Sequence, residues 1–454
     1  MSINRLMITA PNSGGGKTTL TCAILRALCL RGLKPASFKC GPDYIDPMFH
    51  EKVIGAKSTN LDLFFAGEEG LRQLLYRNSI NSDVSVIEGA MGFYDGIGMT
   101  DEASASSIAR ATGTPAVLVA DGKAQALSIA ALISGFVSFR GGTSIKGVIF
   151  NRISPKLYED MKSLVEKECG VRVYGYMPEL KDCVIESRHL GLVTADEIED
   201  IKEKLISLAK AAEESVDIDG LLELASKAPP LEVKPYTPEA ITKARPKIAV
   251  ARDRAFCFYY SDTLRLFEEL GAEIAYFSPL SDIKLPEGCA GLYIGGGYPE
   301  LYARQLSENK AMLKEVNDAV RGGMPTIAEC GGFMYLHSEM EGRDGSFYKM
   351  AGVLPYKAYR TKKLQRFGYI NVQAKEDSLL LSKGESIPAH EFHYWDSSDP
   401  GSGLRALRPR SDKSWDCAHV SKTMYAGYPH LYLFGNPGAA GKFVKACEIY
   451  KEKG

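Results

Sequence analysis

The sequence lacks paired cysteines and an excess of either charge. Ten cysteines are scattered through 454 residues with no Cys-x-x-Cys pair and no cysteine–histidine cluster, which argues against structural zinc and against a secreted disulfide framework. The 55 basic and 56 acidic residues leave a formal net charge of −1, so no overall field recruits nucleic acid or a membrane surface. Any anionic substrate must therefore be held by local basic groups.

Long apolar runs are also missing. No run approaches the roughly 20 residues of a transmembrane helix, and the N-terminus leads directly into a short apolar run at residues 6–10, leaving no room for a leader peptide. A hydrophobic content of 45% with 24% charged residues is typical of a globular enzyme. We therefore expect a cytoplasmic protein with reduced thiols and no nucleic-acid or membrane partner.

What is present is an alternation of short apolar runs and helical patterns. From residue 3 to about 190, strands are expected at residues 6–10, 36–39, 84–88, 116–120, 147–151 and 171–176. Continuous apolar strands between helices predict a parallel sheet covered on both faces. Catalytic groups are then expected beyond the carboxyl ends of the strands.

A second alternation begins after a proline cluster at residues 228–238. The preceding stretch, residues 195–235, is rich in Ala, Glu and Lys and is expected to be helical, whereas the prolines suit a linker. Further strands are expected at 246–251, 272–277, 290–294 and 325–329. The predicted fold class is α/β, with two doubly wound domains at residues 1–235 and 245–454 and a length that suits about two to four domains.

A glycine-rich loop follows the first expected strand and precedes a helical pattern at residues 20–30. In this context backbone N–H groups form an anion site, Lys17 supplies a charge for the outer phosphates, and the Thr18 hydroxyl can bind Mg²⁺. Pro11 replaces the first glycine of the strict phosphate-loop pattern. The alternative is a glycine-rich turn with an exposed lysine. The candidate nucleotide-binding residues are Gly14, Gly15, Gly16, Lys17, Thr18 and Thr19.

Carboxylates follow the second and third expected strands. Mg²⁺ prefers hard oxygen ligands, so Asp43 and Glu88 are candidate ligands beside Thr18, although Glu88 could instead cap a helix. Asp46 and Asp95 are candidate supporting or substrate-binding residues, and turn-stabilising roles explain both equally well.

Cys330 follows the expected strand at 325–329 and is flanked by two glycines, a strand–turn–helix elbow of the kind that exposes a nucleophile. The following helix N-terminus is expected to lower the thiol pKa and to offer N–H donors to an oxyanion. Gly296, in a second glycine loop at residues 295–300, is a candidate for supplying another donor. A buried, inert cysteine is the alternative.

A thiol nucleophile also needs a base. His430 lies in a segment interrupted by glycine and proline downstream of Cys330, and His390 and His393 compete with it. Spacing alone leaves the choice among the three open.

Seven motifs together resemble the cobyrinate a,c-diamide synthase family over essentially the whole chain. They are GGGKTT at 14–19, FKCGPDYIDP at 38–47, NLD at 60–62, EGAMGFYDG at 88–96, RHLGL at 188–192, GGGYPE at 295–300 and AECGG at 328–332. The resemblance implies an N-terminal phosphate-loop domain like dethiobiotin synthetase and a C-terminal class I glutamine amidotransferase domain.

The resemblance also implies roles. Cys330 would be the glutaminase nucleophile and His430 its partner. The broader amidotransferase triad has a glutamate two residues after the histidine, where this chain has Tyr432, so the third group stays unassigned. The implied reaction is ATP- and Mg²⁺-dependent amidation, with L-glutamine as nitrogen donor, of the a and c acetate carboxylates of cobyrinate in cobalamin biosynthesis.

The sequence leaves several alternative functions open. The same chemistry on hydrogenobyrinate or nickel sirohydrochlorin, and a cobyric acid synthase, are close alternatives, and a phosphate-loop partitioning or regulatory ATPase is an alternative of another class. Arg188 and His189 are expected near substrate or in a structural turn. A homodimer is one candidate assembly that the sequence leaves open.

Overall fold

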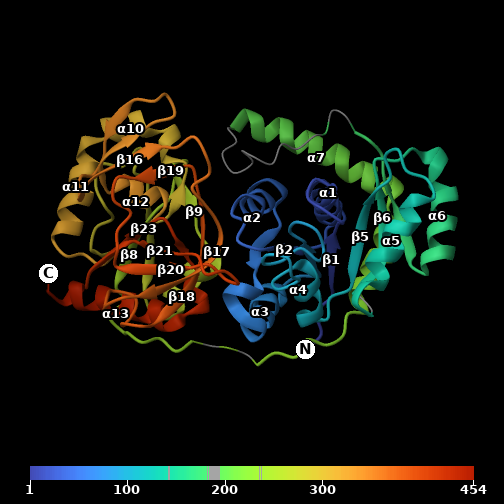
Figure 1. Ribbon diagram of the computed structural model, residues 1–454, viewed down its shortest axis with the longest axis horizontal. Coiled ribbons are helices and arrows are strands. Elements are labelled where there is room, and N and C mark those ends of the chain that lie inside the picture. Colours follow the sequence, from blue (N-terminus) through green and yellow to red (C-terminus); the bar gives the residue numbers. More distant parts are fainter. Residues whose placement is uncertain (142–143, 181–182, 184–194, 235, 237, 454) are drawn as a thin grey trace. The chain divides into compact units, whose positions relative to one another are not determined.

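The computed structural model describes residues 1–141, 144–180, 183, 195–234, 236 and 238–453. The chain forms two compact units, Met1–Tyr236 and Thr237–Gly454 (Figure 1). Each unit is built around its own parallel sheet, so the predicted α/β class is confirmed.

The sheet of the first unit has seven parallel strands in the order β3-β2-β4-β1-β5-β6-β7. Their bounds are β1 Arg5–Thr9, β2 Pro35–Cys40, β3 Lys57–Leu61, β4 Val84–Glu88, β5 Ala116–Asp121, β6 Ile145–Asn151 and β7 Arg172–Met177. Six of them lie where apolar runs predicted strands, whereas the polar sequence of β3 gave no such signal. Strand order changes direction around β1, which places a ligand crevice at the carboxyl ends of β1 and its neighbours.

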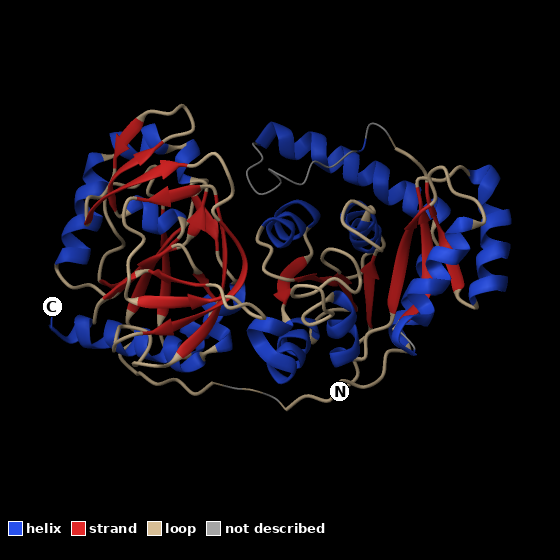
Figure 2. Cartoon of the chain, viewed as in Figure 1, coloured by secondary structure: helices blue, strands red, loops and turns tan. Residues whose placement is uncertain are grey.

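Helices cover both faces of this sheet (Figure 2). On one face the helices α1 (Lys17–Leu30), α7 (Ala195–Ser215) and α8 (Ile218–Ser226) bury apolar side chains against β1, β4 and β5. The remaining helices in the described part of the unit are α2 (Ile45–Phe49), a π-helical turn at His50–Ile54, α3 (Leu63–Ser79), α4 (Ala105–Thr112), α5 (Ser128–Ser138), a 3-10 turn at Phe139–Gly141 and α6 (Pro155–Cys169). A parallel sheet covered on both faces needs strands that are mostly apolar on both sides, as the central strands β1, β4 and β5 are.

The second unit has a six-stranded sheet in the order β10-β8-β11-β13-β23-β22, parallel except at its β22 edge. Its strands are β8 Lys247–Ala251, β10 Glu273–Phe277, β11 Cys289–Ile294, β13 Thr326–Glu329, β22 His419–Val420 and β23 Met424–Gly427. The helices are α9 (Ser261–Glu269), α10 (Ala303–Glu308), α11 (Lys310–Arg321), α12 (Gly331–Tyr335) and α13 (Pro437–Lys453). The strand β13 lies in the middle of the sheet and ends immediately before Cys330.

Further strands, none of them predicted, complete the second unit; they pair antiparallel except for β14 and β16, which pair in parallel. Two short strands, β9 (Phe256–Phe258) and β12 (Gly296–Gly297), pair with each other. A four-stranded sheet contains β14 (His337–Glu341), β15 (Phe347–Lys349), β16 (Leu354–Arg360) and β19 (Trp395–Ser397). A five-stranded sheet contains β17 (Arg366–Ala374), β18 (Ser386–His393), β20 (Leu404–Leu407), β21 (Ser414–Cys417) and β24 (His430–Leu431).

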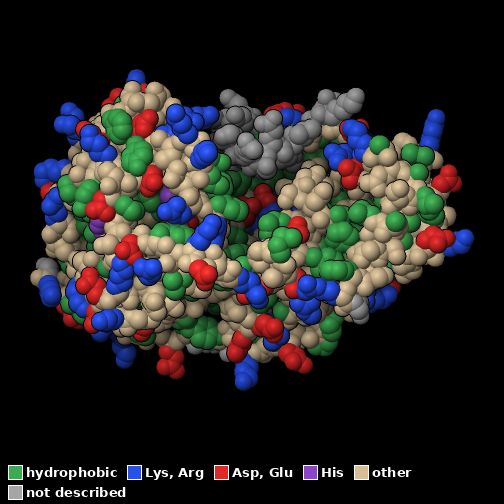
Figure 3. Space-filling model, viewed as in Figure 1, with side chains coloured by type: hydrophobic (Ala, Val, Ile, Leu, Met, Phe, Trp, Pro, Cys, Tyr) green, Lys and Arg blue, Asp and Glu red, His purple; other side chains and the backbone are tan. Residues whose placement is uncertain are grey.

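Basic and acidic side chains are intermingled over the visible surface of both units (Figure 3). Among the described residues, none of the helices combines the length and apolar character that crossing a bilayer requires. Attraction of an anionic ligand therefore depends on charges gathered locally, as in the site described next.

Two candidate active sites

The glycine loop lies at the carboxyl end of β1. Gly14, Gly15 and Gly16 form the loop, and Lys17, Thr18 and Thr19 open α1. Gly16 has φ 94°, and a Cβ there would lie 2.1 Å from Asn151 Nδ2. Only glycine satisfies both the left-handed backbone and this close approach. The loop thus brings backbone close to the helix start, as an anion-binding loop requires.

Lys17 bridges this loop and the one that follows β4. Its Nζ donates to Asn12 O at 2.9 Å and to Met91 O at 2.5 Å. Burial, aided by the neighbouring Lys39 ammonium, lowers the pKa of Lys17 to about 8. A phosphate group at this position would restore the charged form, because an adjacent anion favours the ammonium.

Thr18 and Glu88 are in direct contact. The Thr18 hydroxyl donates to Glu88 Oε1 at 2.6 Å, and Lys39 Nζ donates to the same oxygen at 2.6 Å. Lys39 also forms an ion pair with Asp46 Oδ2 at 2.5 Å. Burial lowers the pKa of Lys39, but the Glu88 and Asp46 carboxylates outweigh it, so the pKa lies above its ordinary value. The two carboxylates thus hold a buried cation between the ends of β2 and β4.

The residues expected to hold Mg²⁺ fit that ion in part. Glu88 Oε2 is buried and makes no hydrogen bond within the described part of the chain, while the Thr18 hydroxyl lies beside the same carboxylate. Burial raises the pKa of Glu88 against the opposing effect of Lys39. A free carboxylate oxygen next to a hydroxyl suits an ion that completes its shell with phosphate oxygens and water.

Asp43 is engaged in its own turn. Its Oδ1 accepts hydrogen bonds from the backbone N–H groups of Ile45 (2.8 Å) and Asp46 (3.2 Å), and Asn60 holds its carbonyl at 2.6 Å. Burial, with the nearby Asp46 carboxylate, raises the pKa of Asp43 to about 6. Across the ranges that the structure describes, no group of three or more His, Cys, Asp or Glu side chains has metal-binding geometry. A direct Asp43–metal bond therefore stays a prediction.

Asp46 and Asp95 have different surroundings. Asp46 is buried against Lys39, whereas Asp95 Oδ2 accepts from the backbone N–H of Gly92 at 3.0 Å. The turn role weighed for Asp95 is thus present, and its carboxylate also lies near enough to favour the charged form of Lys17. Arg188 and His189 lie outside the described residues.

Two residues of this cluster were missed by sequence reasoning. Lys39 lies in an otherwise uncharged strand, a signal that marks a buried charge with a partner. His50 Nδ1 forms a 2.8 Å hydrogen bond with Ser37 Oγ, and its Nε2 lies 3.8 Å from Glu88 Oε2. Burial lowers the pKa of His50 to about 4, so this ring is neutral beside the acidic cluster.

In the second unit Cys330 occupies a strained elbow. It follows β13 with φ 48° and ψ −101°, and its backbone N–H donates to Gly427 O at 2.8 Å. Positive φ is costly for a residue with a side chain and persists where the surrounding structure holds it. The neighbouring Gly332 N–H donates to Gly295 O at 3.0 Å, which ties the elbow to the second glycine loop.

That glycine loop contacts the histidine. A Cβ on Gly296 would lie 2.4 Å from His430 Cε1, and one on Gly331 would lie 3.3 Å from Gly297 N. Gly295 N–H donates to the Tyr259 hydroxyl at 2.9 Å, so this donor is already engaged. Gly296 therefore packs under the His430 ring, and its assignment as an oxyanion donor stays a prediction.

His430 is the competing histidine that touches this loop. It lies on β24, opposite His390 of β18, and is 3% exposed. His393 Nδ1 instead lies 2.6 Å from Trp395 O, and the ring stacks on Tyr428 with centroids 3.9 Å apart. The geometry favours His430 over His393 as the partner of Cys330.

The pKa of Cys330 differs from the expectation. Burial, with Glu300 nearby, raises the thiol pKa to about 12, whereas the sequence predicted a lowered value. The helix α12 that follows spans only five residues, and so short a dipole does not offset desolvation. Burial likewise lowers the pKa of His430 to about 3. Thiol and imidazole are therefore both neutral at rest.

Glu329 is the residue of this site that sequence reasoning missed. It directly precedes Cys330, and its Oε2 lies 3.9 Å from His430 Nδ1. The signal available was a charged residue at the end of a buried strand.

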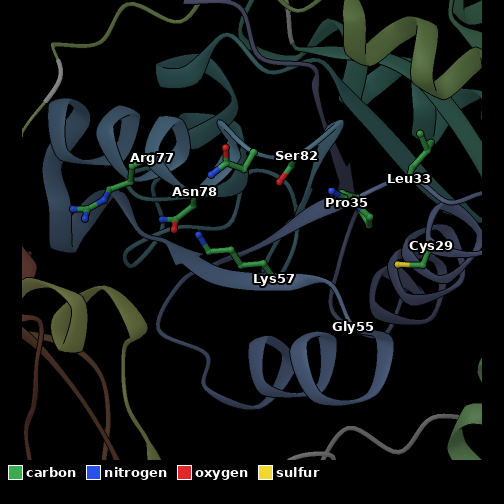
Figure 4. Close-up of a pocket in the computed structure, with 10 residues that line it drawn as sticks. Cys29, Leu33, Pro35, Gly55, Lys57, Arg77, Asn78 and Ser82 are labelled. Carbon is green, nitrogen blue, oxygen red and sulfur yellow. The ribbon is translucent and has the colours of Figure 1, made fainter. Parts of the chain in front are cut away.

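Away from the phosphate loop, a surface hollow of about 320 Å³ lies in the first unit (Figure 4). Pro35 and Lys57, which line it, begin β2 and β3. The hollow therefore lies at the amino ends of these strands, opposite the edge that carries the phosphate loop.

Comparison with known proteins assigns a family to each half. Residues 6–192 match the CobQ/CobB/MinD/ParA nucleotide binding domain, and residues 247–438 match the CobB/CobQ-like glutamine amidotransferase domain. The cobyrinate a,c-diamide synthase of Caldanaerobacter subterraneus subsp. tengcongensis is 41% identical, with 98% of this chain and 99% of that protein covered. The enzyme of the same name from Thermoplasma volcanium is 40% identical, with 100% of this chain and 99% of that protein covered.

The chain belongs to the cobyrinate a,c-diamide synthase family. Two solved structures resemble the chain more distantly. PurLQS from Thermotoga maritima is 18% identical and covers 45% of this chain and 99% of its own, with a TM-score of 0.32. MinD from Aquifex aeolicus is 17% identical and covers 50% of this chain and 99% of its own, with a TM-score of 0.31. Both likenesses are weak, and the family assignment rests on the sequence relatives.

Proposed function

We propose that this chain uses ATP and glutamine to amidate carboxylates of a tetrapyrrole, with the a and c acetates of cobyrinate as the acceptor. The observation that carries the proposal is a single chain holding a phosphate loop, with Lys17, Thr18 and Glu88 in one cluster, and a cysteine elbow hydrogen-bonded to the glycine loop that contacts His430. Relatives of the same length that share both halves are named cobyrinate a,c-diamide synthase.

The first site would activate the acceptor. A carboxylate resists attack by ammonia because its charge repels the nucleophile and oxide is a poor leaving group. Transfer of the γ-phosphoryl group of ATP to the carboxylate would give an acyl phosphate, from which ammonia displaces phosphate. Lys17 would bind the phosphates, with Lys39 held nearby by Glu88 and Asp46. Mg²⁺, held by Thr18 and Glu88, would neutralise charge on the transferred group.

The second site would release ammonia. Cys330 Sγ attacks the side-chain amide of glutamine, its proton passes to His430, and the C–N bond breaks as that proton reaches the leaving nitrogen. The products of this step are ammonia and a thioester, which water hydrolyses to glutamate. The strained elbow holds the sulfur at the end of β13, so that little rearrangement is needed before attack.

The test uses purified protein with ATP, Mg²⁺, glutamine and, in separate reactions, cobyrinate, hydrogenobyrinate or nickel sirohydrochlorin. Product mass reports the number of amides formed. We expect two amides to form on cobyrinate and none on the other two rings. Amidation of another ring in preference to cobyrinate would show that the proposed acceptor is wrong. ATP turnover without amidation of any ring would instead favour a regulatory ATPase.

A matched control separates the two sites. Cys330→Ala is expected to abolish use of glutamine and to keep amidation with ammonium chloride, because the synthetase residues lie in the other unit. Loss of both activities would contradict this division of roles.

A further inference from the structure

The histidine of the glutaminase site lacks its expected third group in sequence. Two residues after His430 stands Tyr432, which is 1% exposed and packs its ring edge-on against Tyr260 with centroids 5.0 Å apart. A phenol packed among aromatic rings does not supply the negative charge that stabilises an imidazolium. Another residue must therefore face His430 if the ring is to be oriented and its cation stabilised.

Glu329, which lies far before His430 in the sequence, is placed to orient the ring and to stabilise its cation. In the parallel pairing of β13 and β23, Glu329 lies opposite Gly427, three residues before the histidine. Its Oε2 lies 3.9 Å from His430 Nδ1, and its Oε1 accepts the backbone N–H of Leu431 at 2.9 Å. One carboxylate thus holds the backbone next to His430 and faces the ring nitrogen.

A third contact fixes the carboxylate itself. Tyr293, on the neighbouring strand β11, donates its hydroxyl to Glu329 Oε2 at 3.0 Å. Glu329 is 1% exposed, and a carboxyl group buried so deeply is costly unless its oxygens are used. Since Leu431 and Tyr293 each supply a donor, the remaining direction of Oε2 is toward His430.

We propose that Glu329 is the positioning residue of the glutaminase: it orients His430 through Leu431 and Nδ1, and its carboxylate stabilises the imidazolium formed when Cys330 loses its proton. The proposal rests on the roles proposed above for Cys330 and His430. The proton of the Cys330 thiol moves to His430 Nε2 as the S–C bond forms. The same proton then leaves with ammonia, so no co-reactant is needed.

The electrostatics of the site agree with this arrangement. Burial raises the pKa of Glu329 to about 8, while the hydrogen bonds from Leu431 and Tyr293 act to lower it. A positive charge appearing at His430 lowers it further and favours the carboxylate form. The carboxylate charge is therefore strongest when the imidazolium is present. His390 and His393 also lie near His430 and oppose its protonation, which makes a nearby anion more necessary.

The first test compares Glu329→Gln with wild-type enzyme. Glutamine keeps an oxygen for the Leu431 N–H but carries no charge, so the fold and the ring position are retained. We expect the glutaminase kcat to fall about ten- to hundredfold with KM within about twofold. Ammonia-dependent amidation should stay within about twofold of wild type. Glu308→Gln, an exposed glutamate on α10, is the matched control and should change neither activity.

A second readout separates positioning from general destabilisation. The rate at which iodoacetamide alkylates Cys330, mapped by mass spectrometry, reports formation of the thiolate. In Glu329→Gln this rate should fall at neutral pH and rise about tenfold per pH unit toward the thiol pKa, as for an unassisted thiol. An unchanged kcat, or equal loss of glutamine- and ammonia-dependent activity, would overturn the proposal. Retention of glutaminase by Cys330→Ala would instead refute the underlying assignment of the nucleophile.

Discussion

Gly296→Ala is expected to disable the glutaminase by displacing a ring. An added Cβ would lie 2.4 Å from His430 Cε1, 3.3 Å from Nε2 and 3.4 Å from Nδ1. Carbon atoms pack at about 3.5 Å or more, so the ring or the loop must move by about 1 Å. Which of the two moves decides the outcome.

The loop has little freedom to move. Gly295 O accepts from Gly332 N–H at 3.0 Å, and Gly295 N–H donates to the Tyr259 hydroxyl at 2.9 Å. On the other side, Gly297 already approaches Ala255 so closely that a Cβ there would lie 2.1 Å from its carbonyl oxygen. The His430 ring is therefore the part that shifts. A displacement of this size between reacting groups costs about 100-fold in rate.

The assay measures glutamate release and ammonia-dependent amidation for wild type, Gly296→Ala and Gly441→Ala. Gly441 lies in α13 of the same unit, where a Cβ would meet only Ile241 Cδ1 at 3.6 Å, so alanine there should be neutral or stabilise the helix by up to about 1 kcal/mol. Gly296→Ala should lose about 100-fold in glutaminase kcat, keep its ammonia-dependent rate and lose about 1–3 kcal/mol of stability from overpacking. A glutaminase kcat within about threefold of wild type would refute the reasoning.

Three further outcomes are expected. Lys17→Ala should abolish ATP turnover and keep glutaminase activity in a direct glutamate assay; intact ATP turnover would contradict the phosphate-loop assignment. Lys39→Met leaves Glu88 and Asp46 buried without their cation, so urea unfolding near neutral pH should show a loss of about 3–5 kcal/mol, and a change below about 1 kcal/mol would argue against this. Glu329 has its folded pKa raised from 4.5 to about 8, so its contribution to wild-type stability is complete below about pH 4.5 and is lost as pH rises to 8, by up to about 1.4 kcal/mol per unit. In Glu329→Gln this fall of stability with rising pH should be absent. Parallel pH–stability curves for the two proteins would contradict the raised pKa of the buried Glu329 carboxyl.

Much of the fold was predictable because its strands are apolar on both faces. The run at Val84–Glu88 was located to the residue, and β8, β11 and β13 were located to within one residue. The strand β3 was missed because Ser58, Thr59 and Asn60 are polar although buried, and their burial depends on neighbours that the sequence does not reveal. The additional strands of the second unit alternate buried and exposed residues along β17 and β18 and do not form continuous apolar runs, so a search for apolar runs did not find them.

The candidate sites were predictable where glycines mark them. Gly16 and the elbow around Cys330 require particular backbone shapes, and such requirements are visible in sequence. Lys39 and Glu329 were missed because their importance comes from contacts with Glu88 and His430, which lie 49 and 101 positions away in the chain. The direction of the Cys330 pKa was wrong because the sequence shows where a helix begins but not that the thiol is buried.

The two sites handle buried charge in opposite ways, and this decides which substitutions each tolerates. In the first, Lys39 is charged at rest and stands between Glu88 and Asp46, so removing one partner exposes the others to the full cost of desolvation. In the second, Cys330 and His430 are neutral at rest, and charge arises only during the reaction. Neutral substitutions there should leave the fold stable while slowing the chemistry, because the electrostatic contribution of Glu329 is needed only once the imidazolium forms. Stability measurements should therefore detect changes at Lys39 most strongly, and glutaminase rates should detect changes at Glu329.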